Sequence, residues 1–273
     1  MDLPVYTSLA LSLDQGIAEI RLNRPDKSNA LHDALWQEIR QAADWADATP
    51  AVRVVILSGA GRNFCAGIDL AMLGSIQQRI AAPEPAQRRA ALHRIIRDLQ
   101  DCLSALERCR KPVIAAIHGA CIGGGLDLVA ACDLRYASAD ALFSIKEIDL
   151  AMVADVGSLQ RLPSLIGQGM TRELAYTGRN VGADEAERLG LINRRYATPE
   201  ELSTGVRTIA ASIAGKSPLA IRGIKQVMNF SRDHRIGEGL EFVAEWNADH
   251  LLSPDLAEVI AAQRERREAK FGD

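Results

Sequence analysis

Three carboxyl side chains stand in mostly apolar surroundings within one short stretch of the sequence. Asp127, Glu147 and Asp155 are each flanked by Leu, Ile, Val or Ala, and a glycine triplet lies just before the first of them, in GGGLDL. Carboxylates are seldom buried unless they cap a helix or pair with a cation, so a single acid here would have a structural interpretation. Three acids beside a glycine-rich turn instead predict an active site that moves protons.

Two glycine-containing segments, FCAGIDL and CIGGGLDL, can bring backbone N–H groups against a ligand oxygen, because glycine has no side chain to obstruct the approach. The second segment leads into a predicted helix, whose N-terminal dipole favours negative charge. We expect the N–H groups of Ile68 and Gly124 to form an oxyanion hole, framed by Ala66, Gly67 and Gly123. The alternative is that both segments are tight turns needed only for packing.

Other chemistries find little support in the motifs. The triplet does not match GxGxxG, and neither a P-loop GxxxxGK[ST] nor a GxSxG elbow occurs. Ser144 and Ser158 have no base evident in the sequence, and His118 is a single histidine beside an apolar strand, which is more often structural than catalytic. The five cysteines have no metal-like spacing, so we expect no metal. Cys65 and Cys121 are interpreted as small buried hydrophobic residues, and reduced thiols favour a cytoplasmic location.

The composition argues against several function classes. Of the 273 residues, 48% are apolar and 25% are charged, as in an ordinary soluble globular protein with a sizeable core. The net charge of -3 gives no general basic field, so we expect no nucleic-acid partner. No apolar run approaches the ~20 residues of a membrane span, and the N-terminus lacks the features of a signal peptide, so no membrane association is expected.

The N-terminal part of the chain predicts strands and helices in alternation. Residues 6–13 and 17–22 are apolar runs on either side of DQG, which indicates a β-hairpin. Asn29 is the expected N-cap of a helix that continues with apolar residues at helical spacing. Residues 52–58, VRVVILS, form a β-branched run typical of a strand buried on both faces, and a glycine-rich loop follows it.

The middle of the chain repeats this order of strand, glycine loop and helix. Residues 74–87 show no clear period and are expected to form a mobile lid over the site. Residues 92–106 give an amphipathic helix, and KPVIAAIHGA gives the next buried strand. A helix with Asp127 in its first turn follows, and then short strands at DLRYA and ALFSI. The repetition predicts an α/β fold of stacked β-β-α units and not a Rossmann sheet.

The chain is predicted to be nearly all helical from Ser158 onward. The last helices carry apolar stripes but are too few to form an independent core, so they should pack on the body or on a neighbouring subunit. We therefore expect a core region at residues 1–200 and a C-terminal helical region at residues 201–273.

Several motifs resemble the enoyl-CoA hydratase/isomerase (crotonase) superfamily in the same order and spacing. They are NRPDKSNAL, FCAGIDL, KPVIAAIHGACIGGGLDL, ACDLRYAS, ADVGSLQRLPSLIG and TGRNVGADEAERLGLIN, and they cover nearly the whole chain. The resemblance implies a crotonase-like spiral of ββα units with a C-terminal helical trimerisation region, assembled as a homotrimer or a dimer of trimers. It also implies an acyl-CoA thioester substrate, with coenzyme A as part of the substrate and no separate cofactor.

Within this superfamily the acids distinguish the reactions. Enoyl-CoA hydratases carry glutamates at the positions of Asp127 and Glu147, and glycine where this chain has Asp155. The trio found here resembles that of the Δ3,5-Δ2,4-dienoyl-CoA isomerases. That resemblance implies proton transfer by Glu147 and Asp155 in the oxidation of unsaturated fatty acids, with Asp127 as a supporting acid.

Two other functions remain open from the sequence. The first is hydration of a 2-enoyl-CoA, with Asp127 and Glu147 handling the water and the α-proton. The second is an acyl-CoA-binding or RNA-binding relative without turnover, against which the three acids and the lack of a basic, aromatic-interleaved surface both argue. Asp155 also keeps a simpler interpretation as a loop cap ahead of Val156 and Gly157.

Overall fold

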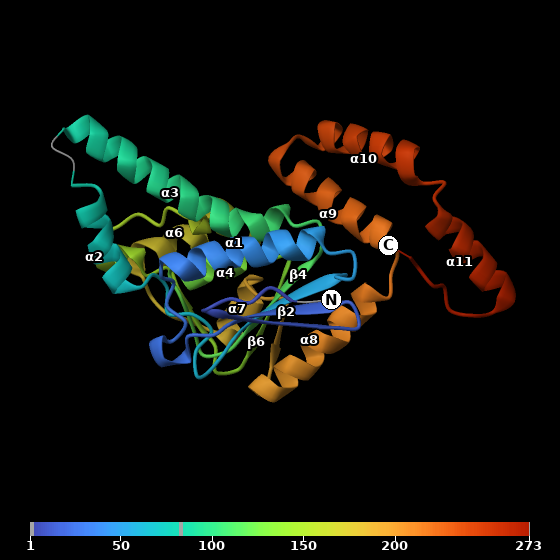
Figure 1. The fold of residues 1–273 in the computed structure, drawn as a ribbon, viewed down its shortest axis with the longest axis horizontal. Helices are drawn as coiled ribbons and strands as arrows, with labels where there is room; N and C mark the ends of the chain where they lie inside the picture. Colours follow the sequence, from blue (N-terminus) through green and yellow to red (C-terminus); the bar gives the residue numbers. More distant parts are fainter. Residues whose placement is uncertain (1–2, 82–83, 273) are drawn as a thin grey trace.

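The computed structural model describes residues 3–81 and 84–272. A larger sheet has six strands in the order β1-β2-β3-β4-β6-β9, and a smaller sheet has three in the order β5-β7-β8. Strands β2, β4 and β6 of the larger sheet are labelled in Figure 1. In the larger sheet only the β1-β2 pair is antiparallel. The strands of the larger sheet are β1 (Leu9–Asp14), β2 (Ile17–Leu22), β3 (Val54–Gly59), β4 (Val113–Ile117), β6 (Leu134–Ser138) and β9 (Arg194–Tyr196). Those of the smaller sheet are β5 (Ala120–Ile122), β7 (Leu142–Ser144) and β8 (Val181–Gly182).

The predicted N-terminal hairpin is confirmed. Strands β1 and β2 pair from Leu9 with Leu22 to Asp14 with Ile17. The two residues between them, Gln15 and Gly16, both have positive φ values, of 49° and 79°. Positive φ at both central residues gives a turn whose twist matches that of the strands, so the turn fixes the register of the hairpin.

Helices cover both faces of the larger sheet. Val55 and Leu57 of β3 belong to a core with α1 and α3, whereas Val54 and Ile56 pack with α8 on the opposite face. This alternation follows from the period of two along a strand, and it confirms the predicted doubly buried strand. The three helices are α1 (Asp33–Ala48), α3 (Pro85–Arg108) and α8 (Pro199–Ala214).

Asn29 is not the N-cap of α1, as the sequence suggested. The cap position belongs to His32, and Asn29 is fully buried with a left-handed backbone, at a φ of 55°. Its Nδ2 donates to the carbonyl oxygens of Ala60 (2.9 Å) and Phe64 (3.0 Å), and its Oδ1 accepts from the N–H of Arg24 (2.8 Å). Asn29 therefore ties the loop before α1 to the first glycine segment.

The irregular lid expected at residues 74–87 is largely helical instead. Helix α2 (Leu70–Arg79) runs through its first part, and α3 begins with a proline, which suits the first position of a helix. Met72 and Ile76, four residues apart, are buried on one face of α2. That apolar pattern spans too few residues to be recognised in the sequence. Residues 82 and 83 of the expected lid lie outside the described residues.

The second glycine segment leads from β5 into α4 (Gly124–Ala130), with Asp127 in the first turn of the helix, as predicted. The predicted short strands at DLRYA and ALFSI are confirmed as β6 and β7. The succession of strand pairs and helices agrees with the predicted α/β fold of stacked β-β-α units. The remaining elements of the body are η1 (Pro25–Lys27), η2 (Glu147–Leu150), α5 (Ser158–Ile166), α6 (Gln168–Thr177) and α7 (Ala183–Leu189).

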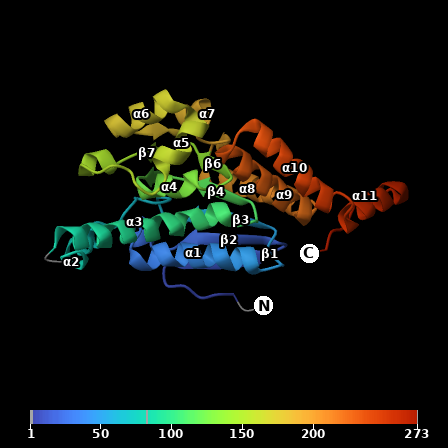
Figure 2. The ribbon, with the colours of Figure 1, turned by 90° about the horizontal axis from the view of Figure 1, so that it is seen from above.

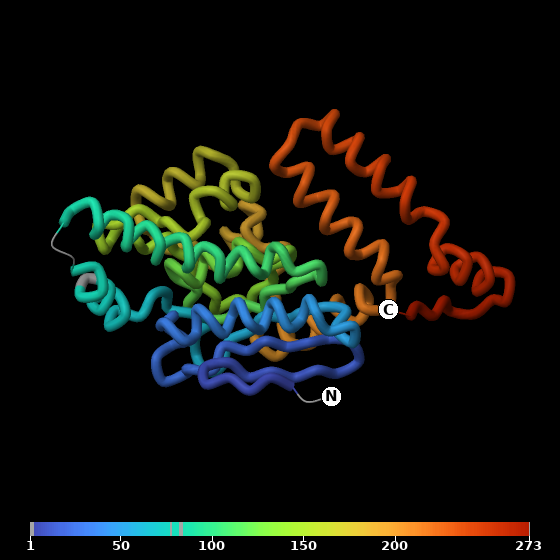
Figure 3. Tube along the Cα trace, turned by 45° about the horizontal axis from the view of Figure 1, so that its top comes forward, coloured from blue at the N-terminus to red at the C-terminus, as the bar shows by residue number. Residues whose placement is uncertain are grey.

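The C-terminal helices α9, α10 and α11 form an arm that extends away from the sheets (Figures 2 and 3). The arm is fastened by Lys225, which is buried and pairs with Asp133 at 2.7 Å while also donating to the carbonyl oxygens of Leu106 and Lys111. Several large apolar side chains of the arm are exposed. They are Ile224, Met228, Ile236, Leu240, Leu251, Leu252, Leu256 and Ile260. The helices of the arm are α9 (Pro218–Asp233), α10 (Ile236–His250) and α11 (Pro254–Glu265).

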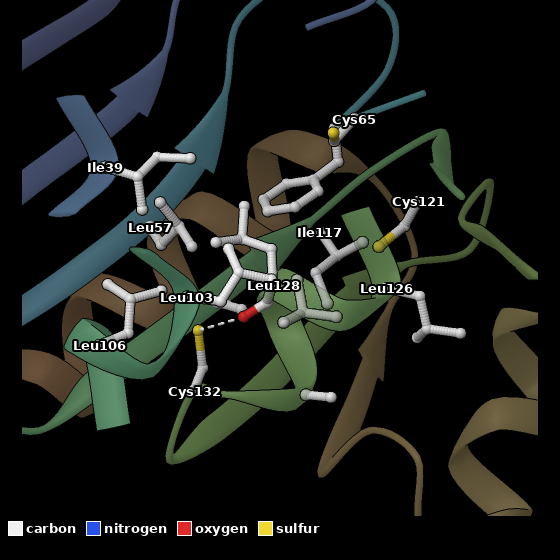
Figure 4. Packing of buried hydrophobic residues seen from close by; sticks show 14 of the residues in the cluster. Ile39, Leu57, Cys65, Leu103, Leu106, Ile117, Cys121, Leu126, Leu128 and Cys132 are labelled. Carbon is white, nitrogen blue, oxygen red and sulfur yellow. Dashed lines mark hydrogen bonds between the residues drawn. The ribbon is translucent and has the colours of Figure 1, made fainter. Parts of the chain in front are cut away.

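The cysteines lie inside the protein as free thiols, and Figure 4 shows Cys65, Cys121 and Cys132 among the buried apolar side chains. Burial raises the pKa of the Cys65 thiol to about 12, and it raises the pKa of Cys121 as well. The Sγ of Cys132 lies 3.6 Å from the carbonyl oxygen of Leu128, a weak contact within α4 and the turn that follows it. The thiols therefore act as small buried hydrophobic groups, as expected for Cys65 and Cys121.

Candidate active site

The two glycine segments meet at a cavity of about 210 Å³. Among its lining residues are seven predicted site residues: Ala66, Gly67, Ile68, Gly123, Gly124, Glu147 and Asp155. The other lining residues are Trp36, Leu70, Leu99, Ile122, Lys146, Leu150, Met152 and Val156. The wall is thus mostly apolar, with two acids and two stretches of glycine-rich backbone facing the same space. Such a cavity suits a largely apolar ligand with one polar reacting group.

Hydrogen bonds between Leu31 and the first glycine segment do not use the N–H of Ile68. The N–H of Leu31 donates to the carbonyl oxygen of Gly67 (2.8 Å), and the N–H of Asp69 donates to the carbonyl oxygen of Leu31 (2.9 Å). Groups alternate in direction along an extended chain, so the N–H of Ile68 turns away from Leu31. Gly124 is the first residue of α4, and its N–H therefore has no acceptor within the helix.

The two segments approach so closely that only glycine fits at their contact. A methyl group at position 67 would lie 2.8 Å from the carbonyl oxygen of Ile122 and 3.5 Å from the nitrogen of Gly124, and Gly67 has a φ of +92°. Gly123, at a φ of +52°, has the carboxylate of Glu147 next to it, with Oε1 3.1 Å from where a Cβ would be. These glycines bring the two N–H groups and one acid around a single small space.

Glu147 begins η2, and this turn is fastened to the end of α6. Lys146 Nζ donates to the carbonyl oxygen of Gly178 at 2.7 Å, and the hydroxyl of Ser144 donates to the same oxygen at 2.8 Å. Gly178 has a left-handed backbone, and a side chain there would come within 3 Å of Ile148. The Oε2 atom of Glu147 is buried and has no hydrogen-bond partner among the described residues. This oxygen is therefore desolvated and unpaired within the described part of the protein.

Asp155 lines the cavity from the segment between η2 and α5, and this residue is more exposed than Glu147. Its main-chain carbonyl oxygen accepts a hydrogen bond from Gln100 Nε2 at 2.6 Å. Desolvation raises the pKa of the Asp155 carboxyl. Burial likewise raises the pKa of Glu147, and the negative charge of Asp155 raises it further. Both carboxyl groups thus hold a proton more readily than an exposed acid does.

Asp127 lies behind the cavity and is fully buried. Its Oδ1 accepts from the N–H of Ser158 at 2.5 Å, at the start of α5, whereas its Oδ2 has no partner among the residues described. Burial, and secondly the charge of Glu147, raise the pKa of Asp127 to about 7. Unlike the other predicted site residues, Asp127 does not line the cavity. It can therefore act on the site through its charge but not by contact with a ligand.

The sequence did not predict every lining residue. Ile122, Lys146 and Val156 are neighbours in sequence of predicted site residues, so adjacency was a usable signal for them. Trp36 and Leu99 come from α1 and α3, where they read as ordinary apolar positions of amphipathic helices, and nothing in the sequence pointed to the site. Within the described residues, no group of three or more His, Cys, Asp or Glu is placed to hold a metal ion. No helix of the described chain is long and apolar enough to cross a bilayer.

Comparison with known proteins identifies the family. The enoyl-CoA hydratase/isomerase family model matches residues 12–273, so the chain belongs to this family and is an enzyme of the crotonase superfamily. A crystal structure of enoyl-CoA hydratase from Bacillus anthracis has a TM-score of 0.87 at 31% identity, over 97% of this chain and 99% of that one. The predicted crotonase-like α/β fold is therefore confirmed.

Two similar relatives carry a more specific name. The peroxisomal delta(3,5)-delta(2,4)-dienoyl-CoA isomerase of Arabidopsis thaliana is 46% identical, and 99% of each chain is covered. The mitochondrial delta(3,5)-delta(2,4)-dienoyl-CoA isomerase of Homo sapiens is 42% identical, over 97% of this chain and 81% of that one.

The cytoplasmic location expected from the cysteines is wrong. The relatives named above are a peroxisomal and a mitochondrial protein, and further mitochondrial relatives from Pongo abelii and Mus musculus are 41% and 40% identical. All five cysteines are free thiols. A reduced thiol reports the redox state of its surroundings, however, and the cytoplasm is not the only reducing compartment. Cysteine usage therefore could not decide the location.

Proposed function

We propose that this enzyme isomerises 3,5-dienoyl-CoA to 2,4-dienoyl-CoA in the oxidation of unsaturated fatty acids. The observation that carries the proposal is that Glu147 and Asp155, both with raised pKa values, line one apolar cavity together with the two glycine segments. The two dienoyl-CoA isomerases that resemble this chain over nearly its whole length support the same reaction.

The thioester of the substrate would be held at the glycine segments. Its carbonyl oxygen would accept hydrogen bonds from the N–H groups of Ile68 and Gly124, which stabilise the negative charge that develops when a proton leaves C2. Ala66, Gly67 and Gly123 keep these groups open to the cavity. The coenzyme A moiety enters as part of the substrate, so the reaction needs no separate cofactor.

Two proton transfers complete the reaction. One carboxylate removes the C2 proton and the electron pair delocalises into a dienolate; a second carboxyl group then donates a proton to C6, and the double bonds move to C2 and C4. We assign Glu147 and Asp155 as this pair, without deciding which of them serves C2. At the end one acid has gained a proton and the other has lost one, so exchange with solvent restores the starting state.

Asp127 would be a supporting acid. Because it is fully buried beside Glu147 and outside the cavity wall, it would not touch the substrate. The charge of Glu147 raises the pKa of Asp127, so Asp127 would hold its proton and would not add a second negative charge beside Glu147. Asp127 would in this way tune the ionisation of Glu147, whose own pKa is raised by burial and by the charge of Asp155.

We also propose that residues 201–273 mediate assembly into a homotrimer or a dimer of trimers, beside the core of residues 1–200. The exposed apolar side chains of α9, α10 and α11 support this role, because large exposed apolar surface on an extended arm is costly in water. Sedimentation analysis of the full chain should give a mass at a multiple of three protomers. A monomer at micromolar concentration would contradict the assignment.

Hydration of a 2-enoyl-CoA is the second candidate function, favoured by the close structural likeness to an enoyl-CoA hydratase. A hydratase using Asp127 and Glu147 needs both acids in contact with the attacking water. The burial of Asp127, and its hydrogen bond to the N–H of Ser158, argue against that contact. Hydration of crotonyl-CoA at a rate similar to isomerisation would favour the hydratase assignment.

Replacement of Asp155 by Asn tests the proposed reaction at the residue that hydratases lack. Loss of one proton-transfer group should lower kcat for 3,5-dienoyl-CoA by roughly 10²–10⁴-fold. The affinity for a saturated acyl-CoA should stay within about threefold, because the amide has the same shape. Asp44→Asn, at a side chain that is 65% exposed on α1, serves as the control and should leave both quantities unchanged. Near-normal turnover by the Asp155→Asn variant would rule out its proton-transfer role.

A further inference from the structure

The segment that carries Asp155, residues 151–157, separates the acyl cavity from a surface groove and is called the partition below. Residues 151–157 contain no helix or strand. Val156 lines both the acyl cavity and a surface groove of about 460 Å³ behind it, between α3, α5 and α9. Ala154 and Val156 are buried in the core, and the N–H groups of Ala151 and Met152 donate to carbonyl oxygens of η2, both at 3.0 Å. Asp155, between the two buried residues, is exposed. The position of the Asp155 carboxyl group within this exposed stretch therefore depends on the polar contacts that hold its own main chain.

The shortest of these contacts comes from Gln100 on α3. Its Nε2 donates to the main-chain carbonyl oxygen of Asp155 at 2.6 Å, and its Oε1 accepts from Nη1 of Arg97, one turn earlier on the same helix, at 2.8 Å. Both ends of the amide are engaged, so its nitrogen is directed at Asp155 and its oxygen at Arg97. The pair Arg97–Gln100 thus links a regular 24-residue helix to the partition.

The side-chain contact from Arg161 to the same segment is weaker. Arg161 Nη1 lies 3.4 Å from the carbonyl oxygen of Val156, which is long for a hydrogen bond, and Arg161 makes its closer contact with Glu107 on α3 at 3.0 Å. Glu147, by contrast, is fastened through Lys146 to the end of α6. The two acids of the proton-transfer pair are therefore held by different helices, and the distance between them depends on both attachments.

We propose that Gln100 is a positioning residue that holds Asp155 at the distance from Glu147 that the proposed isomerisation requires, an inference that rests on that proposed function. Gln100 does not line the cavity, so it would act through the main chain of Asp155 and not by touching the substrate. A proton-transfer group that is free to move by about 1 Å can lose roughly 10²-fold in rate. Substrate binding, which depends on the glycine segments and the apolar wall, should change little.

Two variants separate the contacts of Gln100. Gln100→Met keeps the length of the side chain but loses both hydrogen bonds. Gln100→Glu keeps a partner for Arg97 but cannot donate to the carbonyl oxygen of Asp155. The matched control is Gln160→Met, because Gln160 borders the same groove with an exposed side chain that has no hydrogen-bond partner in the described part of the chain.

In both Gln100 variants kcat for 3,5-dienoyl-CoA should fall by roughly 10–100-fold with KM within about threefold, whereas Gln160→Met should match the wild type. Turnover in D2O measures deuterium uptake at each end of the diene, and general destabilisation of the protein would not change uptake at one end selectively. Asp155→Asn should suppress deuterium uptake at one end of the diene, and the Gln100 variants should reduce uptake at that same carbon only. Equal loss at both carbons, or unchanged kcat, would overturn the proposal.

Amide hydrogen exchange keeps the test independent of the reaction. In Gln100→Met, a peptide covering residues 151–157 should exchange at least about threefold faster than in the wild type and in Gln160→Met, because the segment has lost its shortest side-chain hydrogen bond. If the wild type failed to isomerise dienoyl-CoA, the proposed function would be wrong. The exchange of residues 151–157 would still decide whether Gln100 holds the segment, and unchanged exchange would refute that role.

Discussion

Replacement of the buried Asp127 by Asn should stabilise the protein at alkaline pH. Burial raises the pKa of this carboxyl from 3.8 to about 7 in the folded protein, a difference of about three pH units. Each unit corresponds to about 1.4 kcal/mol, so ionising Asp127 in the folded state costs about 4 kcal/mol more than in the unfolded chain. Asn can keep the acceptor for the N–H of Ser158 and carries no charge, so the variant avoids this cost.

The sign follows from the protons bound by each state. Below about pH 4 the carboxyl is neutral in both states, so the wild type and the variant should have similar stability. Between pH 4 and pH 7 the unfolded carboxyl ionises while the folded one keeps its proton, so the wild type loses stability relative to the Asn variant as pH rises. Above pH 7 the difference is constant.

Urea unfolding followed by tryptophan fluorescence can measure this difference at pH 5 and pH 8. The stability advantage of Asp127→Asn should grow by about 3 kcal/mol between the two values. The control is Asp44→Asn, whose side chain is 65% exposed and whose replacement should give no such growth. An advantage of Asp127→Asn that does not change with pH would refute the burial argument, and with it the supporting role of this acid.

Three further outcomes follow from the geometry of the site and the arm. Gly67→Ala should lower kcat by at least about 10²-fold, because φ is +92° and the new methyl group would lie 2.8 Å from a carbonyl oxygen. The control is Gly74→Ala, on α2 with open space around it, which should keep wild-type activity and raise the free energy of unfolding by about 0.5–1 kcal/mol. Lys225→Met should lower the free energy of unfolding by roughly 3–5 kcal/mol, because it removes the cation that pairs with Asp133 at the base of the arm. An unchanged midpoint in thermal or urea unfolding would contradict this. The isomerisation rate should fall at both acid and alkaline pH, since one carboxyl group must be ionised and the other protonated. Because the pKa of Glu147 is raised, the fall on the acid side should begin above pH 4.5. A rate that is flat from pH 4 to pH 9 would exclude the mechanism.

Local sequence patterns were sufficient for much of the fold and for the centre of the site. The β-branched run VRVVILS and the turn DQG specify structure over a few neighbouring residues, and both predictions were confirmed. The glycine triplet and the acids of GGGLDL and IKEIDL mark the site because glycine and buried carboxylates are informative even in isolation. Seven of the eight predicted site residues line one cavity, and the eighth, Asp127, lies directly behind it.

What the sequence did not reveal depends on contacts between distant segments. Asn29 is of a residue type common at helix N-caps, but its hydrogen-bond partners Ala60 and Phe64 are more than 30 residues away in the sequence. The attachment of Asp155 to Gln100 spans 55 residues and involves only a main-chain oxygen of the acid, so no residue pattern reports it. Helix α2 escaped notice because its buried face has only a few apolar positions before the prolines begin.

The rate of conversion of 3,5-dienoyl-CoA to its 2,4-isomer, compared with the hydration of crotonyl-CoA by the same preparation, tests the central claim most directly. Ultraviolet absorbance follows both reactions, and several acyl chain lengths should be used. With Glu147 and Asp155 as a proton-transfer pair and Asp127 withdrawn from the cavity, isomerisation should exceed hydration by at least about 10²-fold. Hydration at an equal or higher rate, or no isomerisation at any chain length, would contradict it.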